Sequence, residues 1–309
     1  MFIPIYHYVF PIENRYKLDG IRPIWINKFI KQIEWIQNNY EIIDPRNFIS
    51  DINKFKNDNK RKRCLITFDD GTKDQFENAS KILDIYNIKG IFFVLSDVLK
   101  NKKIPLTHLL HIAMCRHKSS DIISMIIRSG LLKEQFDEKQ LIKKSHIYEY
   151  EKNKSKRILK YLVNYELGEF YEDLKNILLG LLLSDEKSLC ESWFGSIDNV
   201  KDASLRGHLI GNHGKTHKSY ENLSIKNIRN EILHSHNFIS DIIGSEVKVF
   251  SHPQGGDNGK KNCYVKNILS DKNYKACFSI KNSMNSNLSD IFNISRFDAK
   301  DIPAQKYNF

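Results

Sequence analysis

Short apolar runs alternate with amphipathic helical patterns in residues 1–100 and 191–309. The runs that read as buried strands are 2–9, 64–68, 91–95, 208–212, 247–250, 276–280 and 292–297. Between two of them, from Asp74 to Tyr86, apolar residues recur at helical spacing. Strands that alternate with helices are typical of parallel βαβ units. We therefore expect an α/β fold in which the strands form a distorted (β/α) barrel.

The pattern changes between residues 101 and 190. Strand signals vanish there, and helical periodicity with dense Lys and Glu replaces them. We expect 1–100 and 191–309 to form the barrel and 101–190 to be a helical insertion. The run Ile177–Leu183 is too short to span a bilayer, so we interpret it as a buried helix of the insertion. A dimer contact and a lid over an amphiphilic substrate remain alternatives.

Two adjacent carboxylates, Asp69 and Asp70, follow the strand that ends at Phe68, and Gly71 turns the chain after them. The carboxyl end of a parallel strand is where active-site residues gather in α/β folds. Neighbouring strand residues point to opposite sides, so one aspartate can hold a metal ion while the other handles protons. A solvated Asp-Asp-Gly turn is the alternative interpretation.

A pair of histidines, His213 and His217, follows another strand, Leu209–Ile210. Histidines four apart can reach one ion if the intervening turn is tight, and neutral imidazole is a common metal ligand. Surface histidines also fall at this spacing by chance. The adjacent strand and the glycines Gly211 and Gly214 nevertheless repeat the arrangement around Asp69 and Asp70.

Thr67-Phe68-Asp69-Asp70-Gly71 joined to His213-Gly214-Lys215-Thr216-His217 resembles the polysaccharide deacetylase family, the NodB-homology fold of carbohydrate esterase family four. The resemblance runs from about Tyr6 to Phe297, and the helical insertion interrupts it. It implies a NodB-type (β/α) barrel with Asp69 as catalytic base and one divalent cation on Asp70, His213 and His217. Zinc is the expected metal, with cobalt or nickel as alternatives. The implied substrate is an N-acyl, most often N-acetyl, amino sugar.

The third motif departs from the family pattern. In Phe250–Gly255, Ser251 stands where the family has an arginine that orients the catalytic aspartate. We hypothesise that Arg296, a lone arginine in the last apolar strand, pairs with Asp69 instead; a surface ion pair is the alternative. We expect His252, Pro253 and Gln254 to face the substrate, with a backbone amide near Gln254 stabilising the oxyanion. Since Gln254 replaces an aromatic residue of the family, a formyl group stays open beside acetyl.

The general acid is not fixed by the motifs. The family takes it from a histidine near the carboxyl terminus, but this chain has no histidine after His252. Either His7 or His252 could protonate the leaving amine, or the proton could return through Asp69. His7, in a Tyr-His pair at the end of the first strand, is equally open to a structural interpretation.

The net charge of +11 comes from 48 basic and 37 acidic side chains. Without a zinc-finger or RNA-recognition signature, charge alone does not support a nucleic-acid partner. An anionic substrate, an anionic membrane face and a merely soluble basic surface are the other interpretations. The substrate could be free, nucleotide-linked or lipid-linked. Homo-oligomerisation stays open.

Five scattered cysteines without a Cys-x-x-Cys pair suggest free thiols in a reducing compartment. We expect no signal peptide, because the first residues lack a charged region followed by a long apolar one, and no transmembrane segment. The predicted protein is thus a cytoplasmic enzyme, with peripheral membrane contact as an option. It would act on an amino sugar of an envelope glycan or its precursor. A catalytically inactive carbohydrate-binding relative is the main alternative.

Overall fold

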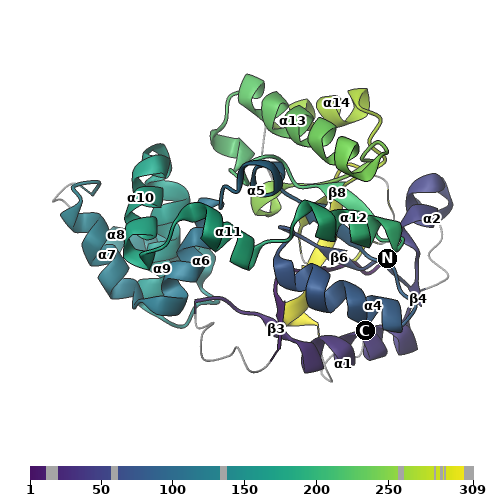
Figure 1. Ribbon diagram of the computed structural model, residues 1–309, viewed down its shortest axis with the longest axis horizontal. Coiled ribbons are helices and arrows are strands. Elements are labelled where there is room, and N and C mark those ends of the chain that lie inside the picture. Colours follow the sequence, from purple (N-terminus) through teal and green to yellow (C-terminus); the bar gives the residue numbers. More distant parts are fainter. Residues whose placement is uncertain are drawn as a thin grey trace. The chain divides into compact units, whose positions relative to one another are not determined.

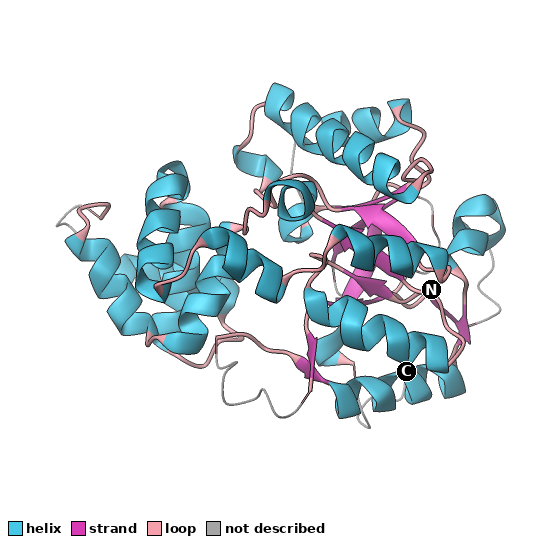
Figure 2. Ribbon diagram, viewed as in Figure 1, coloured by secondary structure: helices cyan, strands magenta, loops and turns pink. Residues whose placement is uncertain are grey.

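The computed structural model describes residues 1–11, 20–56, 62–132, 138–256, 261–281, 283–285, 288 and 290–302. Two compact units make up this part of the chain (Figure 1). The barrel unit comprises the described residues of Met1–Ile12, Pro23–Lys103 and Cys190–Phe309. The helical unit comprises those of Glu13–Arg22 and Ile104–Leu189. All strands of the described chain belong to the barrel unit (Figure 2).

Seven parallel strands close into a barrel within the described residues, in the order β1-β11-β10-β9-β8-β7-β6. They are β1 (Pro4–Tyr6), β6 (Thr67–Phe68), β7 (Ile91–Val94), β8 (Leu209–Asn212), β9 (Val249–Ser251), β10 (Ala276–Ile280) and β11 (Ile294–Asp298). Strands that pair in the barrel are consecutive among these seven along the chain. β1 closes the ring because it pairs with both β6 and β11. The α/β barrel expected from the sequence is confirmed.

Two expected strands are interrupted. The run 2–9 forms β1 and then β2 (Val9–Phe10), which pairs with β3 (Ile24–Trp25) outside the barrel. The run 64–68 divides into β5 (Arg63–Cys64), which pairs with β4 (Glu41–Ile42), and β6. An apolar run shows that a segment is buried but does not show which partner it pairs with, so hydropathy alone could not find these breaks.

The helices of the barrel unit bury apolar stripes against the strands. α1 (Ile26–Asn39) buries Phe29, Ile33 and Ile36, and Ser224 caps α13 (Ile225–Ile243) by accepting a hydrogen bond from the Asn227 amide. The others are α2 (Pro45–Ser50), α3 (Asn53–Lys56), the π-helix η2 (Gln75–Ala79), α4 (Ser80–Ile85), α5 (Ser96–Asn101), α12 (Ile197–Leu205), η6 (Tyr220–Asn222), η7 (Pro253–Gly255), α14 (Asn262–Asp271) and η9 (Ala299–Asp301).

The helical unit has a core of its own, formed by residues such as Leu109, Ile122 and Leu178. Its elements are α6 (Leu106–Arg116), α7 (Ser119–Arg128), α8 (Glu138–Lys144), η3 (Ser145–Tyr148), α9 (Lys154–Tyr161), η4 (Leu162–Glu166), η5 (Gly168–Phe170) and α10 (Tyr171–Leu182). In sequence, α11 (Glu186–Trp193) continues from this unit into the barrel unit. No helix in the described ranges is long and apolar enough to cross a membrane.

Residues of the barrel strands alternate between two environments. Ile3, Phe93, Val249, Phe278 and Ile294 belong to one buried cluster, whereas their neighbours along the strands pack in a second cluster with the helices. Strand residues two apart share a face. At the carboxyl end of a strand, the last inward-facing side chain therefore points toward the barrel axis. A polar residue at that position can line a site.

His208, just before β8, is a buried histidine with an unusual pKa. Burial disfavours the charged imidazole and outweighs the attraction of Asp84, which lowers the pKa of His208 to about 4. Nδ1 of His208 accepts a hydrogen bond from the Gly90 amide at 3.2 Å. The ring is therefore held in its neutral form inside the fold.

We expect His208 to make the protein acid-sensitive. Its contribution to the free energy of unfolding is fully present above the unfolded pKa of roughly 6.5 and disappears as the pH falls to about 4, because the unfolded chain binds the proton first. The loss should be roughly 2–3 kcal/mol. Urea unfolding between these pH values would measure it. His208→Gln cannot titrate and should lose less; an equal loss in both proteins would contradict the prediction.

Candidate metal centre and active site

The predicted site residues meet at one rim of the barrel unit, where the parallel strands end. Asp69 and Asp70 follow β6, His7 follows β1, and the loop from His213 to His217 follows β8. The turn of His252, Pro253 and Gln254 follows β9, and Arg296 lies on β11. Five separate strands thus contribute to the site, as is common at the carboxyl ends of a (β/α) barrel.

Asp69 and Arg296 form a buried, bidentate ion pair. Nη1 and Nη2 of Arg296 donate to Oδ1 and Oδ2 of Asp69, both at 2.7 Å. Ser251 completes the cluster, since its hydroxyl donates to Oδ2 of Asp69 at 2.9 Å and accepts from Nη2 of Arg296 at 2.7 Å. Burial opposes the ionised carboxylate, but the charges of Arg296 and His213 outweigh it and lower the pKa of Asp69. Asp69 is therefore a carboxylate held in one orientation.

The barrel interior explains why Arg296 reaches Asp69. Arg296 lies two residues after the inward-facing Ile294, so its side chain enters the same interior. Its guanidinium lies over the rings of Phe93 and Phe278, at 5.5 and 5.8 Å from their centroids. The side chain is 0% exposed, which excludes the surface ion pair that the sequence left open. Ser251 also occupies an inward position, two residues after Val249.

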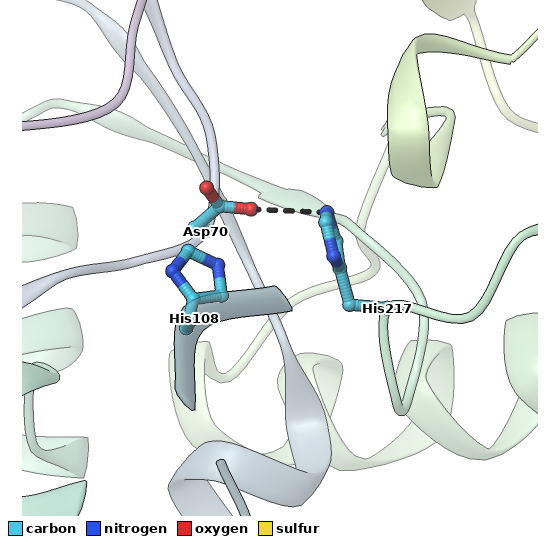
Figure 3. A group of neighbouring side chains, drawn as sticks. All are labelled: Asp70, His108 and His217. Carbon is cyan, nitrogen blue, oxygen red and sulfur yellow. Dashed lines mark ion pairs between the residues drawn. The ribbon is translucent and has the colours of Figure 1, made fainter. Parts of the chain in front are cut away.

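Asp70 faces both histidines of the second motif. Its Oδ1 lies 3.3 Å from Nε2 of His213 and 3.2 Å from Nε2 of His217, and Figure 3 shows the second of these pairs. Nδ1 of His213 lies 2.9 Å from the carbonyl oxygen of Ser251. If that nitrogen carries the proton, Nε2 presents its lone pair to the carboxylate.

These three atoms fit a divalent cation. A carboxylate oxygen and two imidazole lone pairs repel one another unless a proton or a metal ion lies between them. The distances of 3.2 and 3.3 Å from the carboxylate oxygen to the two imidazole nitrogens match the ligand–ligand distance in a tetrahedral site with zinc–ligand bonds of about 2.0–2.1 Å. Burial lowers the pKa of His213, but Asp69 and Asp70 outweigh it and raise the pKa. The cluster therefore attracts positive charge.

Backbone strain gathers at this rim. Asp70, His217 and Gln254 are three of the seven described non-glycine residues with a positive φ, at 81°, 63° and 61°. Such conformations cost energy and persist where the surroundings fix them. The left-handed backbone of Asp70 turns the chain after β6, and the two carboxylates have different partners: Arg296 pairs with Asp69, and Asp70 faces His213 and His217.

Glu231 on α13 holds the loop between the two histidines, and the sequence did not reveal it. Its carboxylate accepts hydrogen bonds from the amides of Lys215 and Thr216 at 3.0 and 2.8 Å, and from the Thr216 hydroxyl at 2.8 Å. Ser235 on the same helix donates to the carbonyl of Gly214 at 2.9 Å. The sequence did contain one signal for this role: an acidic residue lies beside the buried stripe of Ile228 and Ile232, where its carboxylate needs hydrogen-bond donors.

Glu231→Ala should weaken metal binding about 10- to 100-fold, because residues that orient metal ligands typically contribute that much. Two loop amides would lose their acceptor, and the spacing between His213 and His217 would no longer be fixed. Competition with a chromogenic chelator measures the affinity. Glu221→Ala, which alters an exposed side chain, is the matched control. Equal affinities in both variants would refute the anchoring role.

Gly214 lies in the loop between His213 and His217, where the backbone conformation and the neighbouring side chains both favour glycine. Its φ is 85°, and a Cβ there would lie 2.8 Å from the Tyr220 hydroxyl oxygen and 3.3 Å from Cγ of Pro253. Both neighbours are buried. The position therefore favours glycine on conformational and steric grounds.

His7 is positioned through its backbone by the loop after Asp70. The carbonyl of His7 accepts hydrogen bonds from Oγ1 of Thr72 at 3.0 Å and from Nε2 of Gln75 at 2.7 Å. Gln75 also donates to the carbonyl of Asp69. Gln75 thus ties the backbone of His7 to that of Asp69.

The turn from His252 to Gly255 lies beside His217. Nε2 of Gln254 is 3.3 Å from Nδ1 of His217, and Gln254 is exposed, whereas His252 and Pro253 are buried. The amide of His252 donates to the carbonyl of Phe278, and that of Gly255 to the carbonyl of His252. The oxyanion hypothesis concerns the backbone amides of this turn, to which Pro253 contributes none because proline has no N–H.

A protein-family model and several solved structures match this chain. The family model for polysaccharide deacetylases matches residues 56–134 and 188–277. No curated protein sequence matches the chain significantly.

Similar solved structures extend over almost the whole chain. The Streptococcus pyogenes deacetylase PplD in complex with acetate is 13% identical with a TM-score of 0.55, covering 96% of this chain and 91% of its own. IcaB from Ammonifex degensii is 12% identical with a TM-score of 0.57, at the same coverages of 96% and 91%. A de-N-acetylase from Aggregatibacter actinomycetemcomitans is 13% identical with a TM-score of 0.57, covering 99% and 96%. At these identities the likeness concerns the fold.

Proposed function

Because the chain belongs to the polysaccharide deacetylase family, we propose that it is a metal-dependent hydrolase that removes an N-acyl group, in the first place N-acetyl, from an amino sugar. The observation that carries the proposal is the pairing of two clusters at one rim. Asp70, His213 and His217 bring three metal-ligand atoms together, and Asp69 is an oriented carboxylate beside them.

A divalent cation bound by these three residues would lower the pKa of a coordinated water and polarise the acyl carbonyl. Asp69 would accept the proton of the attacking water, since Arg296 and His213 keep it ionised near neutral pH. The ion pair with Arg296 and the hydroxyl of Ser251 would hold Asp69 in position during this transfer. The backbone amide of Gln254 is the proposed donor to the oxyanion.

The leaving amine needs a proton, and we propose His7 as its source. The backbone carbonyl of His7 is fixed by Thr72 and Gln75, and Gln75 also donates to the carbonyl of Asp69. His252 is the weaker candidate because it is buried beside Phe250, with a ring-to-ring distance of 5.6 Å. A proton held by Asp69 could also return directly to the amine.

We further propose that the substrate belongs to a cell-envelope glycan or its precursor and that the protein acts in the cytoplasm, with peripheral membrane contact as an option. The amino sugar would be free, nucleotide-linked or lipid-linked. This proposal rests on the five scattered cysteines, which include no Cys-x-x-Cys pair. Among the expected metals, zinc suits a site of two imidazoles and one carboxylate.

The function is tested by measuring acetate and formate release from N-acetylated and N-formylated amino sugars, as monosaccharides, nucleotide sugars and oligosaccharides. The protein is first reconstituted with zinc, cobalt or nickel. We expect acetate release with at least one metal and none in excess chelator. Formate release would redirect the assignment to a deformylase. If an acylated sugar binds but is not hydrolysed with any of the three metals, the deacetylase assignment would give way to the inactive carbohydrate-binding alternative.

A further inference from the structure

Two polar side chains of the helix after β6 hold the backbone of Val9, which lies two residues after His7. The Val9 amide donates to Oδ2 of Asp74, and Nδ2 of Asn78 donates to the Val9 carbonyl at 2.9 Å. We propose that Asp74 and Asn78 are positioning residues that fix the segment carrying His7 for the deacylation reaction. Because His7 is the proposed general acid, this role rests on the proposed function.

Side chains, rather than a barrel strand, satisfy the backbone of this segment. The carbonyl of Tyr8 accepts a hydrogen bond from the first residue of β3. The carbonyl of His7 and both polar backbone groups of Val9 bond instead to side chains within residues 72–78. Buried backbone groups need such partners, so the place of this segment depends directly on those side chains.

The same helix also contacts the proposed catalytic base. Gln75, the residue after Asp74, donates to the carbonyls of both His7 and Asp69. Asp74 precedes the π-helix η2, and Asn78 lies within it. π-helical turns are rare and are frequent at functional sites. One element thus bonds to the segment of the proposed acid and to the backbone of the proposed base.

The carboxylate of Asp74 is costly to the fold. It is 4% exposed, and burial raises its pKa to about 6, although the hydrogen bond from the Val9 amide acts in the opposite direction. This pKa lies above the ordinary value of roughly 3.9, so the ionised group lowers the free energy of unfolding near neutral pH. Strongly shifted carboxyl groups of this kind gather at functional sites, which favours a role beyond structural support.

Hydrogen–deuterium exchange of the metal-free, full-length protein tests the contact itself. Asp74→Ala should speed exchange of the Val9 amide about tenfold, and Asn78→Ala about threefold, because hydrogen bonds to charged groups are the stronger ones. Asp74→Asn should exchange nearly as slowly as the wild type, since its amide oxygen can accept from Val9. Glu77→Ala alters an exposed side chain of η2 and is the matched control.

Kinetics test whether the contact acts through His7. Asp74→Ala should lower kcat about tenfold with KM nearly unchanged, because a displaced acid slows the reaction without weakening substrate binding. In a His7→Gln background, Asp74→Ala should cause little further loss, since the group that it positions is gone. Asp74→Asn should recover most of kcat. Asn78→Ala, which removes a weaker bond, repeats the comparison if Asp74→Ala does not fold.

The outcomes separate this role from the proposed function. Unchanged exchange in Asp74→Ala and Asn78→Ala would overturn the positioning role. An equal loss of kcat with and without His7 would also overturn it, because a purely structural effect does not depend on the acid. If the wild type releases neither acetate nor formate, the proposed function fails and the catalytic role of this contact fails with it.

Discussion

Asp69→Asn should lower kcat for deacylation about 10³-fold while leaving the bound metal in place. The amide keeps the shape of the carboxylate but cannot accept a proton from water. Its effect on the metal should be small, because the proposed ligand atoms belong to Asp70, His213 and His217. The measurement is steady-state acetate release by the metal-reconstituted variant.

Asp69→Asn also leaves Arg296 buried without its carboxylate, so the fold must be checked. Removing one partner of a buried pair typically costs about 3–5 kcal/mol. Thermal unfolding will show whether the variant is folded at the assay temperature. Asp198→Asn alters an exposed carboxylate on α12 and should behave as the wild type does. A folded Asp69→Asn variant with nearly full activity would remove Asp69 from the mechanism.

Arg296→Met should lower kcat about 10²-fold and shift the acidic limb of the pH–rate profile to higher pH. Arg296 is the strongest influence that holds the pKa of Asp69 down against burial, so its loss raises that pKa. A larger share of the enzyme then carries a protonated Asp69 near neutral pH and lacks its base. The free energy of unfolding should fall by about 3–5 kcal/mol.

The pH profile separates positioning from mere structural support. Arg296→Lys restores the charge but not the two parallel hydrogen bonds, and it should recover the acidic limb with only part of kcat. A structural role alone would lower the stability of Arg296→Met and leave the acidic limb unchanged. That result would refute the assignment of Arg296 as the residue that positions Asp69.

The sequence was sufficient to predict the barrel because its signals are local. Apolar runs mark buried strands, and Ser224 precedes the periodic helix that it caps. The two motifs follow strands, and parallel strands end at the same rim, so their meeting could also be anticipated. Their roles in metal binding and catalysis remain predictions until they are measured.

Other features depend on contacts that a single sequence does not encode locally. The break between β5 and β6 arises because Arg63–Cys64 pairs with β4, while Thr67–Phe68 joins the barrel. The π-helical start of the helix after Asp74 leaves the apolar periodicity almost unchanged, so hydropathy could not reveal it. Glu231 lies in a different element from the histidine loop that it holds.

The pairing of Arg296 with Asp69 lies between these cases. A lone arginine in an apolar strand shows that a buried charge needs a partner, but it does not name one. Strand alternation adds that Arg296 shares a face with Ile294, and barrel closure then brings β11 beside β1 and close to β6. Ser251 could have been found in the same way, two residues after Val249.

The metal content of the purified protein, compared with that of Asp70→Ala, tests the central claim most directly. Each preparation is stripped with chelator, reconstituted with zinc, cobalt or nickel, dialysed, and analysed by mass spectrometry of the metal. We predict about one equivalent of metal in the wild type and nearly none in Asp70→Ala, since one of three protein ligands is lost. No bound metal in the reconstituted wild type, or equal metal in both proteins, would contradict a catalytic centre at Asp70, His213 and His217.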